Sequence, residues 1–364
     1  MKADRNTLKA WRLGCQKLVP PCWQRPQQVA IWLGGVQAQD YRWARWSLGL
    51  RTEGCTDEQV LQAIAERQIV RTWMFRGTLH FVAAADLFWL TALLAPGITR
   101  RNERRYRQLG LDNSAFSKSQ QVLRRALEIS SSLTRAEIKK HFEMKGVPAE
   151  GQQVPYLLQR AALEGLICQG IPHGGEPTYT LISDWIGTGE MLDRAEAMAA
   201  LARRYFASHG PATLQDFAWW SGLTAREARQ AIESVPEIVP VEVDGIQYWA
   251  TSDPPTASPT ESSALLPAFD EYLLGYQERS VVLDPAYAKR VNAGGGMLKP
   301  TVMVNGEIVA IWSHTEKQHA LQVSIQPFRE LASCELDLIA GAVNRFSSYR
   351  SLPSKVEFAG DFSP

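Results

Sequence analysis

The chain has 364 residues, of which 45% are hydrophobic and 21% are charged, and these proportions exclude a largely disordered or fibrous protein. Its formal net charge is +1, so a polyanionic partner has to be held by a local basic patch rather than by the whole chain. No stretch approaches the roughly 20 uncharged apolar residues of a membrane helix, and the N-terminus lacks the apolar core of a secretory signal. We therefore expect a cytoplasmic protein whose five scattered cysteines are free thiols.

Residues 1–110 are expected to form a first unit that is mainly helical and ends in two strands. Apolar periodicity predicts four helical segments, at residues 7–18, 25–39, 41–51 and 56–67. The pair Gly34-Gly35 is expected to end or weaken the second of them, just before the sequence Gln-Ala-Gln-Asp. The β-branched and aromatic runs on either side of Arg76-Gly77 predict the two strands.

Residues 111–190 are expected to form a second unit with the order helix, turn, helix, hairpin. A helix is predicted over 133–144, because Thr134 followed by Glu137 is typical of a capping box. A second helix is predicted over 152–167. The two runs that flank the Gly/Pro-rich tip at 171–177 predict a β-hairpin. This order is typical of a winged helix-turn-helix.

Residues 191–252 repeat that order and are expected to form a third unit. Three helices are predicted, at residues 195–210, 213–222 and 223–235. Asp244-Gly245 lies between two strand-like runs and favours a hairpin with a type I′ turn. With the first unit as an embellished copy, the sequence predicts three tandem winged helix-turn-helix units.

Residues 253–364 are expected to form a C-terminal region of a different kind. The Pro/Ser/Thr-rich segment 252–263 is typical of a linker or a long loop. Strands, a hairpin with Asn305-Gly306 at its tip, and an amphipathic helix over 328–349 are predicted after it. The expected fold class is therefore α+β: three tandem winged helix-turn-helix units with a C-terminal α+β cap.

An arginine cluster makes nucleic-acid binding the first functional candidate. The segment 71–107 holds seven arginines against two acids, and two more arginines lie one turn apart at Arg42 and Arg45. The planar guanidinium group suits bidentate contact with phosphate. A solvated helix face is the alternative interpretation, and winged helices also bind proteins, so the architecture favours DNA without settling it.

Two further clusters of polar residues are candidates for a site. Arg76, Thr78 and His80 alternate along one predicted strand, which indicates either a lined cleft or a half-buried ladder. Asp270 and Glu271 are adjacent, and neighbouring strand residues point to opposite sides, so they need not form an acid–base pair. His209 is interpreted as a surface or helix-end residue.

The pair Gln37 and Gln39 is the remaining candidate. Each amide can donate and accept hydrogen bonds, so two of them can hold a water molecule without carrying charge. From spacing alone, a solvated helix end is the stronger interpretation, because glutamines separated by one residue are common.

Four stretches of the chain together resemble the AlkZ/YcaQ family of winged-helix DNA glycosylases: GGVQAQD (34–40), VRTWMFRGTLHFV (70–82), LLPAFDEYLLGYQERS (265–280) and GGGMLKPTVMVNGEIVAIW (294–312). The resemblance covers nearly the whole chain. It implies a basic, concave face for double-stranded DNA and excision of alkylated bases, in some members crosslinked ones, without a metal or cofactor.

The resemblance also implies roles for single residues. Gln37-Ala38-Gln39 matches the Gln-hydrophobic-Gln motif of the crosslink-unhooking branch, so Gln37 and Gln39 are the expected catalytic residues, placing the water that attacks C1′. With no lysine in this motif, we expect a monofunctional enzyme. The expected DNA contacts are Arg42, Arg45, Arg71, Arg76, Thr78, His80, Tyr276 and Arg279, although the stretch around Tyr276, Arg279 and Asp270 assigns no specific role. A non-enzymatic DNA-binding protein and a protein–protein scaffold are the competing hypotheses.

Overall fold

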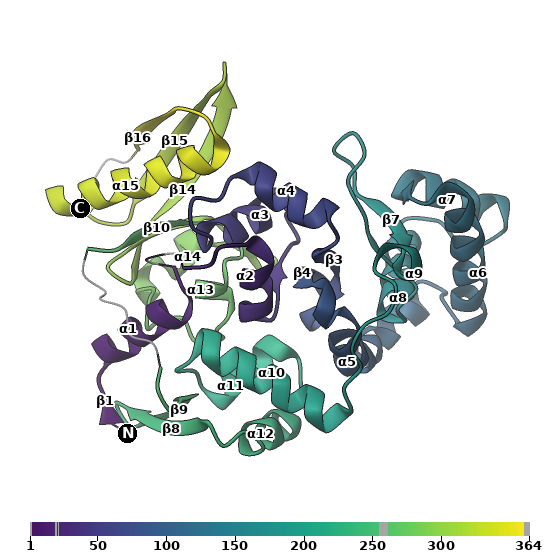
Figure 1. Ribbon diagram of the computed structural model, residues 1–364, viewed down its shortest axis with the longest axis horizontal. Coiled ribbons are helices and arrows are strands. Elements are labelled where there is room, and N and C mark those ends of the chain that lie inside the picture. The colour runs from purple at the N-terminus through teal and green to yellow at the C-terminus, as the bar shows by residue number, and fades with distance from the viewer. Residues whose placement is uncertain (1, 19, 21, 255–260, 360–364) are drawn as a thin grey trace.

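The computed structural model describes residues 2–18, 20, 22–254 and 261–359. Helices and strands are mixed along the chain. Most of the second unit forms a lobe at one side of a larger body, and the C-terminal region covers the opposite side of that body (Figure 1). Within the described part of the chain, no helix is long and apolar enough to cross a membrane.

The first unit has the predicted order of helices followed by a hairpin. Its elements are α1 (Arg5–Cys15), α2 (Pro26–Leu33), β2 (Val36–Gln37), α3 (Tyr41–Leu50), α4 (Asp57–Ala65), β3 (Ile69–Met74), β4 (Thr78–Ala83) and α5 (Leu87–Gln108). Thr56 caps α4 through a capping box with Gln59. The arginine-rich segment lies on α5, a 22-residue helix that contains Pro96 and for which the sequence predicted no boundaries.

The second unit contributes its hairpin to a sheet that it shares with the first. Its elements are α6 (Asn113–Ser130), β5 (Leu133–Thr134), α7 (Arg135–Met144), α8 (Gln153–Leu163), β6 (Ile167–Gln169), β7 (Thr178–Leu181) and α9 (Ile182–Trp185). The six-stranded sheet has the order β2-β4-β3-β6-β7-β5, and Arg71 on β3 is the register partner of Gln169 on β6. The two hairpins therefore meet edge to edge, a pairing that no local pattern predicts.

The third unit confirms the predicted helices and turn. Its elements are α10 (Arg194–His209), α11 (Leu214–Ser221), α12 (Ala225–Glu233), β8 (Ile238–Val243) and β9 (Ile246–Thr251). Thr224 and Glu227 form the capping box of α12, as predicted. Asp244 and Gly245 both have positive φ, which matches a type I′ turn. The short strand β1 (Lys2–Ala3) adds in parallel to β8.

The C-terminal region is built around a five-stranded sheet with the order β10-β13-β14-β15-β16. Its elements are β10 (Ser263–Leu266), α13 (Glu271–Leu274), α14 (Ala288–Val291), β11 (Asn292–Gly294), β12 (Met297–Leu298), β13 (Thr301–Val304), β14 (Glu307–Lys317), β15 (Ala320–Pro327), α15 (Ser333–Arg350) and β16 (Ser354–Phe358). Asn305-Gly306 forms the predicted hairpin tip, and residues 255–260 of the expected linker lie outside the described residues.

The hydrophobic cores cross the expected unit boundaries. One core joins the first unit to the C-terminal region, and buried Trp46 donates its indole N–H to the carbonyl of Leu265 at 2.7 Å there. A second core joins β3, β4 and α5 to the third unit, and a third core lies within the second unit's lobe and the adjoining end of α5. The Gln-Ala-Gln segment thus lies in a body that the first unit, the third unit and the C-terminal region build together.

Candidate active site

Two glycines shape the turn that leads into the Gln-Ala-Gln segment. Gly34 ends α2 in the left-handed region, at φ 76°, which glycine adopts without strain. A Cβ on Gly35 would lie 2.7 Å from the ring of Phe75, so only glycine allows the chain to pass this close to the aromatic core. The chain then enters β2 and pairs with β4, where Gln37 is the register partner of His80.

Gln37 and Gln39 lie on either side of Ala38 and have different exposures. Gln37 is only 7% exposed, and its Oε1 accepts long hydrogen bonds of 3.4 Å from Arg76 and from Thr78. Gln39 is exposed, and its Oε1 accepts from the Leu79 backbone N–H at 3.4 Å. Neither amide NH2 group donates a hydrogen bond within the described residues, so both remain available to a ligand or to water.

The predicted cluster of Arg76, Thr78 and His80 surrounds Gln37, although the strand alternation does not extend to Arg76. This residue lies in a turn at φ 58°, and its guanidinium donates to the carbonyl of Trp220 at 2.6 Å while lying over the ring of Trp219. Of the two interpretations of this stripe, the structure supports burial for His80, which is 1% exposed.

Arg71 lies in the interior and not at a surface that a phosphate could reach, because its guanidinium is buried and each of its three nitrogens donates a hydrogen bond. Its Nε and Nη2 donate to the carbonyl of Ala38 at 2.9 and 2.7 Å, and Nη2 also donates to that of Gln39 at 3.3 Å. Its Nη1 donates to Oε1 of Gln169 at 2.7 Å. Arg71 therefore fixes the backbone between the two glutamines.

A buried carboxylate, Glu271, to which the sequence assigned no specific role, lies behind this cluster. Glu271 is fully buried, and its Oε2 accepts from the indole N–H of Trp220 at 2.9 Å and from Nε2 of His209 at 3.3 Å. Its Oε1 has no partner among the described residues. His209 ends α10 as expected, but it is buried rather than at the surface. In the sequence, the only indication of this buried carboxylate was the pair of adjacent acids at positions 270 and 271.

Asp270 and Glu271 have different hydrogen-bond partners, so they form no acid–base pair, but they lie at the start of the helix α13 and not on a strand as the alternation argument assumed. The Asp270 carboxylate accepts two hydrogen bonds from Arg51, at 2.8 and 2.9 Å, and one from the hydroxyl of Ser47 at 2.9 Å. Both partners of this ion pair are buried. Asp270 therefore ties α3 to the start of α13, and it supports the site without facing it.

Burial and nearby charge set the protonation states around Gln37. Burial, followed by the positive charge of Arg76, lowers the pKa of His80 to about 4, so its imidazole is neutral at pH 7. Burial raises the pKa of the Glu271 carboxyl, but the hydrogen bond from His209 and the charges of its neighbours outweigh it and hold that pKa below its ordinary value. The region behind Gln37 thus combines a cation, a neutral imidazole and a carboxylate.

The low pKa of His80 predicts a pH-dependent part of the stability. The unfolded chain binds a proton at His80 below about pH 6.5, whereas the folded chain binds it only below about pH 4. The free energy of unfolding should therefore fall as the pH is lowered from 6.5 to 4. His80→Gln should flatten this dependence in urea titrations at stepped pH, and the exposed His173→Gln should leave it unchanged; equal slopes in all three proteins would contradict the assignment.

The remaining expected DNA contacts are divided between the surface and the interior. Arg42 is exposed, and half-buried Arg279 lies over the ring of Trp219 while its Nε donates to the carbonyl of Leu273. Arg45 is buried in an ion pair with Asp57 at 2.8 Å. Tyr276 is fully buried, and its hydroxyl donates to the carbonyl of His209. The last two placements differ from the expected DNA contacts, because buried and paired groups do not reach a phosphate.

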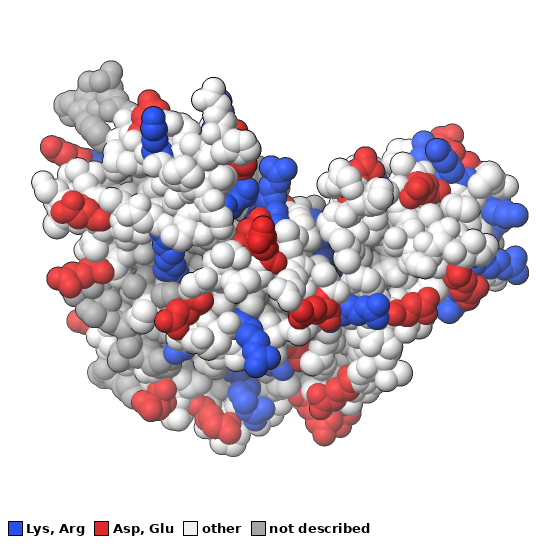
Figure 2. All heavy atoms as spheres, turned by 45° about the horizontal axis from the view of Figure 1, so that its top comes forward, with Lys and Arg blue, Asp and Glu red and all other residues white. Residues whose placement is uncertain are grey.

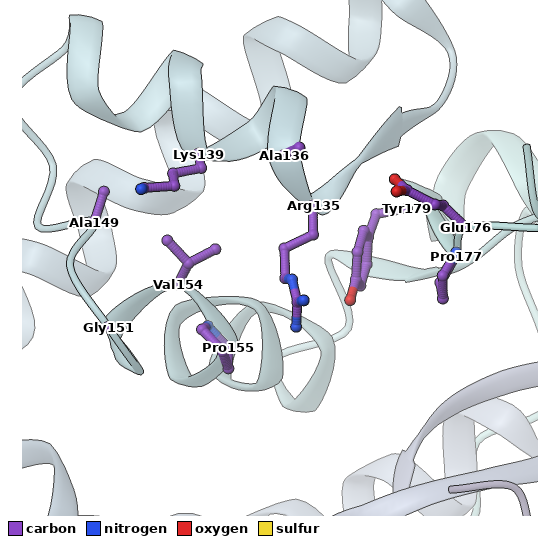
Figure 3. Close-up of a pocket in the computed structure, with 10 residues that line it drawn as sticks. All are labelled: Arg135, Ala136, Lys139, Ala149, Gly151, Val154, Pro155, Glu176, Pro177 and Tyr179. Atoms are coloured by element: carbon purple, nitrogen blue, oxygen red, sulfur yellow. The ribbon is translucent and has the colours of Figure 1, made fainter. Parts of the chain in front are cut away.

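The surface is hollowed between the second unit's lobe and the larger body. Figure 2 shows this hollow, with Lys and Arg side chains along the side formed by the larger body. A separate pocket of about 660 Å³ lies within the lobe, where Arg135 of α7 extends between Tyr179 and Pro155 and Lys139 points toward Ala149 (Figure 3). Among the described residues, no group of three or more His, Cys, Asp or Glu side chains could hold a metal ion.

Comparisons with known proteins agree over nearly the full length of the chain. A family model described as DNA glycosylase AlkZ-like matches residues 31–349. A curated Streptomyces sahachiroi protein named interstrand DNA cross-link repair glycosylase is 25% identical over 386 aligned positions, which cover 98% of this chain and all of that protein. The solved structure of the Streptomyces sahachiroi DNA glycosylase AlkZ superposes with a TM-score of 0.81 at 25% identity, over 98% of this chain and all of that one.

Proposed function

This chain belongs to the DNA glycosylase AlkZ-like family and is a DNA glycosylase, and from that premise we propose that it excises guanine alkylated at N7 and unhooks interstrand crosslinks. The observation that supports this mechanism is the pair of available amide NH2 groups, of Gln37 and Gln39, on either side of a clamped Ala38 backbone. Gln37 and Gln39 are the proposed catalytic residues, and the water molecule that they place attacks C1′ of the sugar.

Excision of an N7-alkylated guanine needs no strong base from the protein. Alkylation at N7 makes the guanine cationic, so the bond between N9 and C1′ breaks with its electron pair leaving on the base, which becomes neutral. The sugar develops positive charge, and the oxygen of the placed water bonds to C1′ while its proton passes to solvent. Neutral amides can position that water without a strong base.

The side chains around Gln37 support this proposed mechanism. Arg76 and Thr78 both donate toward Oε1 of Gln37, which directs its NH2 group elsewhere. His80 is neutral at pH 7 and so adds no positive charge beside the developing cation. Glu271 supplies a fixed negative charge behind the cluster. These neighbours orient Gln37 and make the region tolerant of positive charge, as an electrostatically prepared site requires.

Binding of double-stranded DNA is assigned to cations that reach the surface around this centre. Exposed Arg42, beside the Gln-Ala-Gln segment, and half-buried Arg279, over Trp219, are the proposed phosphate contacts nearest to it. The exposed arginines of α5 extend the basic surface. We propose that the helix–hairpin units of residues 1–110, 111–190 and 191–252 act as three winged helices along the duplex, and that the protein acts in the cytoplasm. No metal or cofactor enters the proposed reaction.

Base release from defined duplexes tests the proposal. The purified protein is incubated with an oligonucleotide duplex that carries one 7-methylguanine, and with a nitrogen-mustard crosslinked duplex. Alkaline cleavage at the abasic site should appear with the first, and separation of the two strands with the second. Salt-sensitive duplex binding without release from either substrate would contradict the proposal and favour a non-enzymatic DNA-binding protein.

A further inference from the structure

We propose that Gln169 of the second unit is a positioning residue for base excision, acting through Arg71 on the backbone between Gln37 and Gln39. The inference rests on the proposed function of the two glutamines. It assigns the second unit a part in the reaction besides any contact with DNA.

The first step is the clamp on the Gln-Ala-Gln backbone. Three hydrogen bonds from Arg71 reach the carbonyls of Ala38 and Gln39, and the Ala38 N–H donates to the carbonyl of Leu79 at 2.7 Å. The peptide groups that join Gln37 to Gln39 are therefore held from both sides. Their orientation sets the angle between the two side chains and hence the place where both can reach one water molecule.

The second step is what holds Arg71. Its Nη1 donates to Oε1 of Gln169 at 2.7 Å, the shorter end of the range for a charge-assisted hydrogen bond. Gln169 is 5% exposed and reaches Arg71 from β6, on the far side of the junction between the two hairpins. Its Nε2 donates in turn to the hydroxyl of Tyr179 at 3.4 Å, a residue that also lines the pocket in Figure 3.

The third step is the consequence of losing this acceptor. Arg71 is 6% exposed, so without Gln169 one N–H of a buried cation has no partner. The guanidinium then shifts toward another acceptor or toward water, because an unpaired buried charge is costly. Its bonds to the Ala38 carbonyl move with it. A displacement of about 1 Å in such a segment can lower the rate of reaction about a hundredfold.

Two substitutions of Gln169, one that removes the hydrogen-bond acceptor and one that keeps it, distinguish a positioning role from a role in packing alone. Gln169→Leu removes the acceptor while keeping an apolar side chain of similar size. Gln169→Glu keeps an acceptor for Arg71, and the Tyr179 hydroxyl can reverse and donate to it. Thr180→Val is the matched control: this buried hydroxyl on neighbouring β7 donates to Ser131, away from the active site.

The experiment has two readouts. In single-turnover assays on the 7-methylguanine duplex, Gln169→Leu should slow base release about tenfold or more, with the Kd for undamaged duplex changed less than about threefold. Gln169→Glu and Thr180→Val should stay within about threefold of the unchanged protein. Hydrogen exchange of the segment 34–41 should accelerate in Gln169→Leu alone.

The two readouts keep this inference separate from the proposed function. If the unchanged protein releases no base, the proposed function fails, and the exchange rates still decide whether Gln169 orders the segment. The inference is overturned if exchange in Gln169→Leu matches that in Thr180→Val. It is overturned equally if base release in Gln169→Leu is as fast as in Gln169→Glu, or if the loss lies only in DNA binding.

Discussion

Replacing Gln37 with alanine should reduce base release at least about a hundredfold while duplex binding persists. The substitution removes the amide that is oriented by Arg76 and Thr78, and with it one of the two proposed hydrogen bonds to the attacking water. Gln39→Ala removes the other and should have an effect of similar size. The measurement is single-turnover excision of 7-methylguanine, with duplex affinity determined in parallel.

Gln230→Ala is the matched control for these variants. Gln230 is an exposed residue of α12 in the third unit, so the same chemical change there should leave excision unaltered. Melting temperatures should be close in all of these variants, because Gln37 makes only long hydrogen bonds and Gln39 is exposed. Full activity in Gln37→Ala and Gln39→Ala would remove both glutamines from the mechanism.

The largest loss of stability is expected for Asp270→Ala. The substitution leaves Arg51 as an unpaired charge in the interior, and breaking a buried ion pair in this way costs about 3–5 kcal/mol. It also removes the acceptor for Ser47 and for the N–H of Tyr272 at the start of α13. Urea unfolding at pH 7 measures the free energy of unfolding directly.

Two comparisons make this prediction specific. Lys139→Ala breaks the exposed pair with Glu143 and should change the free energy of unfolding by less than about 0.5 kcal/mol. The double variant Arg51→Met, Asp270→Leu removes both buried charges and should recover part of the stability lost in the single variant. If Asp270→Ala costs no more than Lys139→Ala, the ion pair does not support the fold.

The ion pair between Asp270 and Arg51 also makes the free energy of unfolding depend on pH in acid. Burial raises the pKa of its carboxyl, but the charge and hydrogen bonds of Arg51 outweigh burial and hold that pKa below the ordinary 3.8. This contribution is complete above the unfolded pKa and is lost as the pH falls through the lower folded pKa. The Asp270 contribution is therefore present at neutral pH and is lost only below about pH 3.8, whereas the His80 contribution changes between pH 6.5 and 4.

Local signals in the sequence were sufficient for most helices and turns. The capping boxes at Thr134 and Thr224, and the turns at Asp244-Gly245 and Asn305-Gly306, depend on residues at most three apart. The helices α5 and α6 were not assigned boundaries. In α5 the cause is physical, since Pro96 has no N–H for the helix ladder and argues against a continuous helix there.

Nonlocal pairing accounts for what the sequence did not predict about the site. The cluster around Gln37 was found because Thr78 and His80 share a strand, and the family resemblance identified the glutamines. Arg71 was expected to contact phosphate, and its buried position could not be predicted because its acceptors come from segments 33 and 98 positions away in sequence. Glu271 was named only as a neighbour of Asp270, because its partners lie on α10 and α11, which no pattern of spacing connects to it.

The shared core of the first unit and the C-terminal region has a consequence for synthesis of the chain. Ribosomes synthesise a protein from the N-terminus to the C-terminus at about 5–20 residues per second. Gln37 and Gln39 emerge early, but Trp46 packs on Leu265, Arg51 pairs with Asp270, and β1 needs β8 as its neighbour. Roughly tens of seconds therefore pass between the synthesis of the two glutamines and the synthesis of the residues that pack around them. A nascent chain therefore carries the Gln-Ala-Gln segment long before its surroundings can form, and these contacts cannot form until translation has passed Asp270.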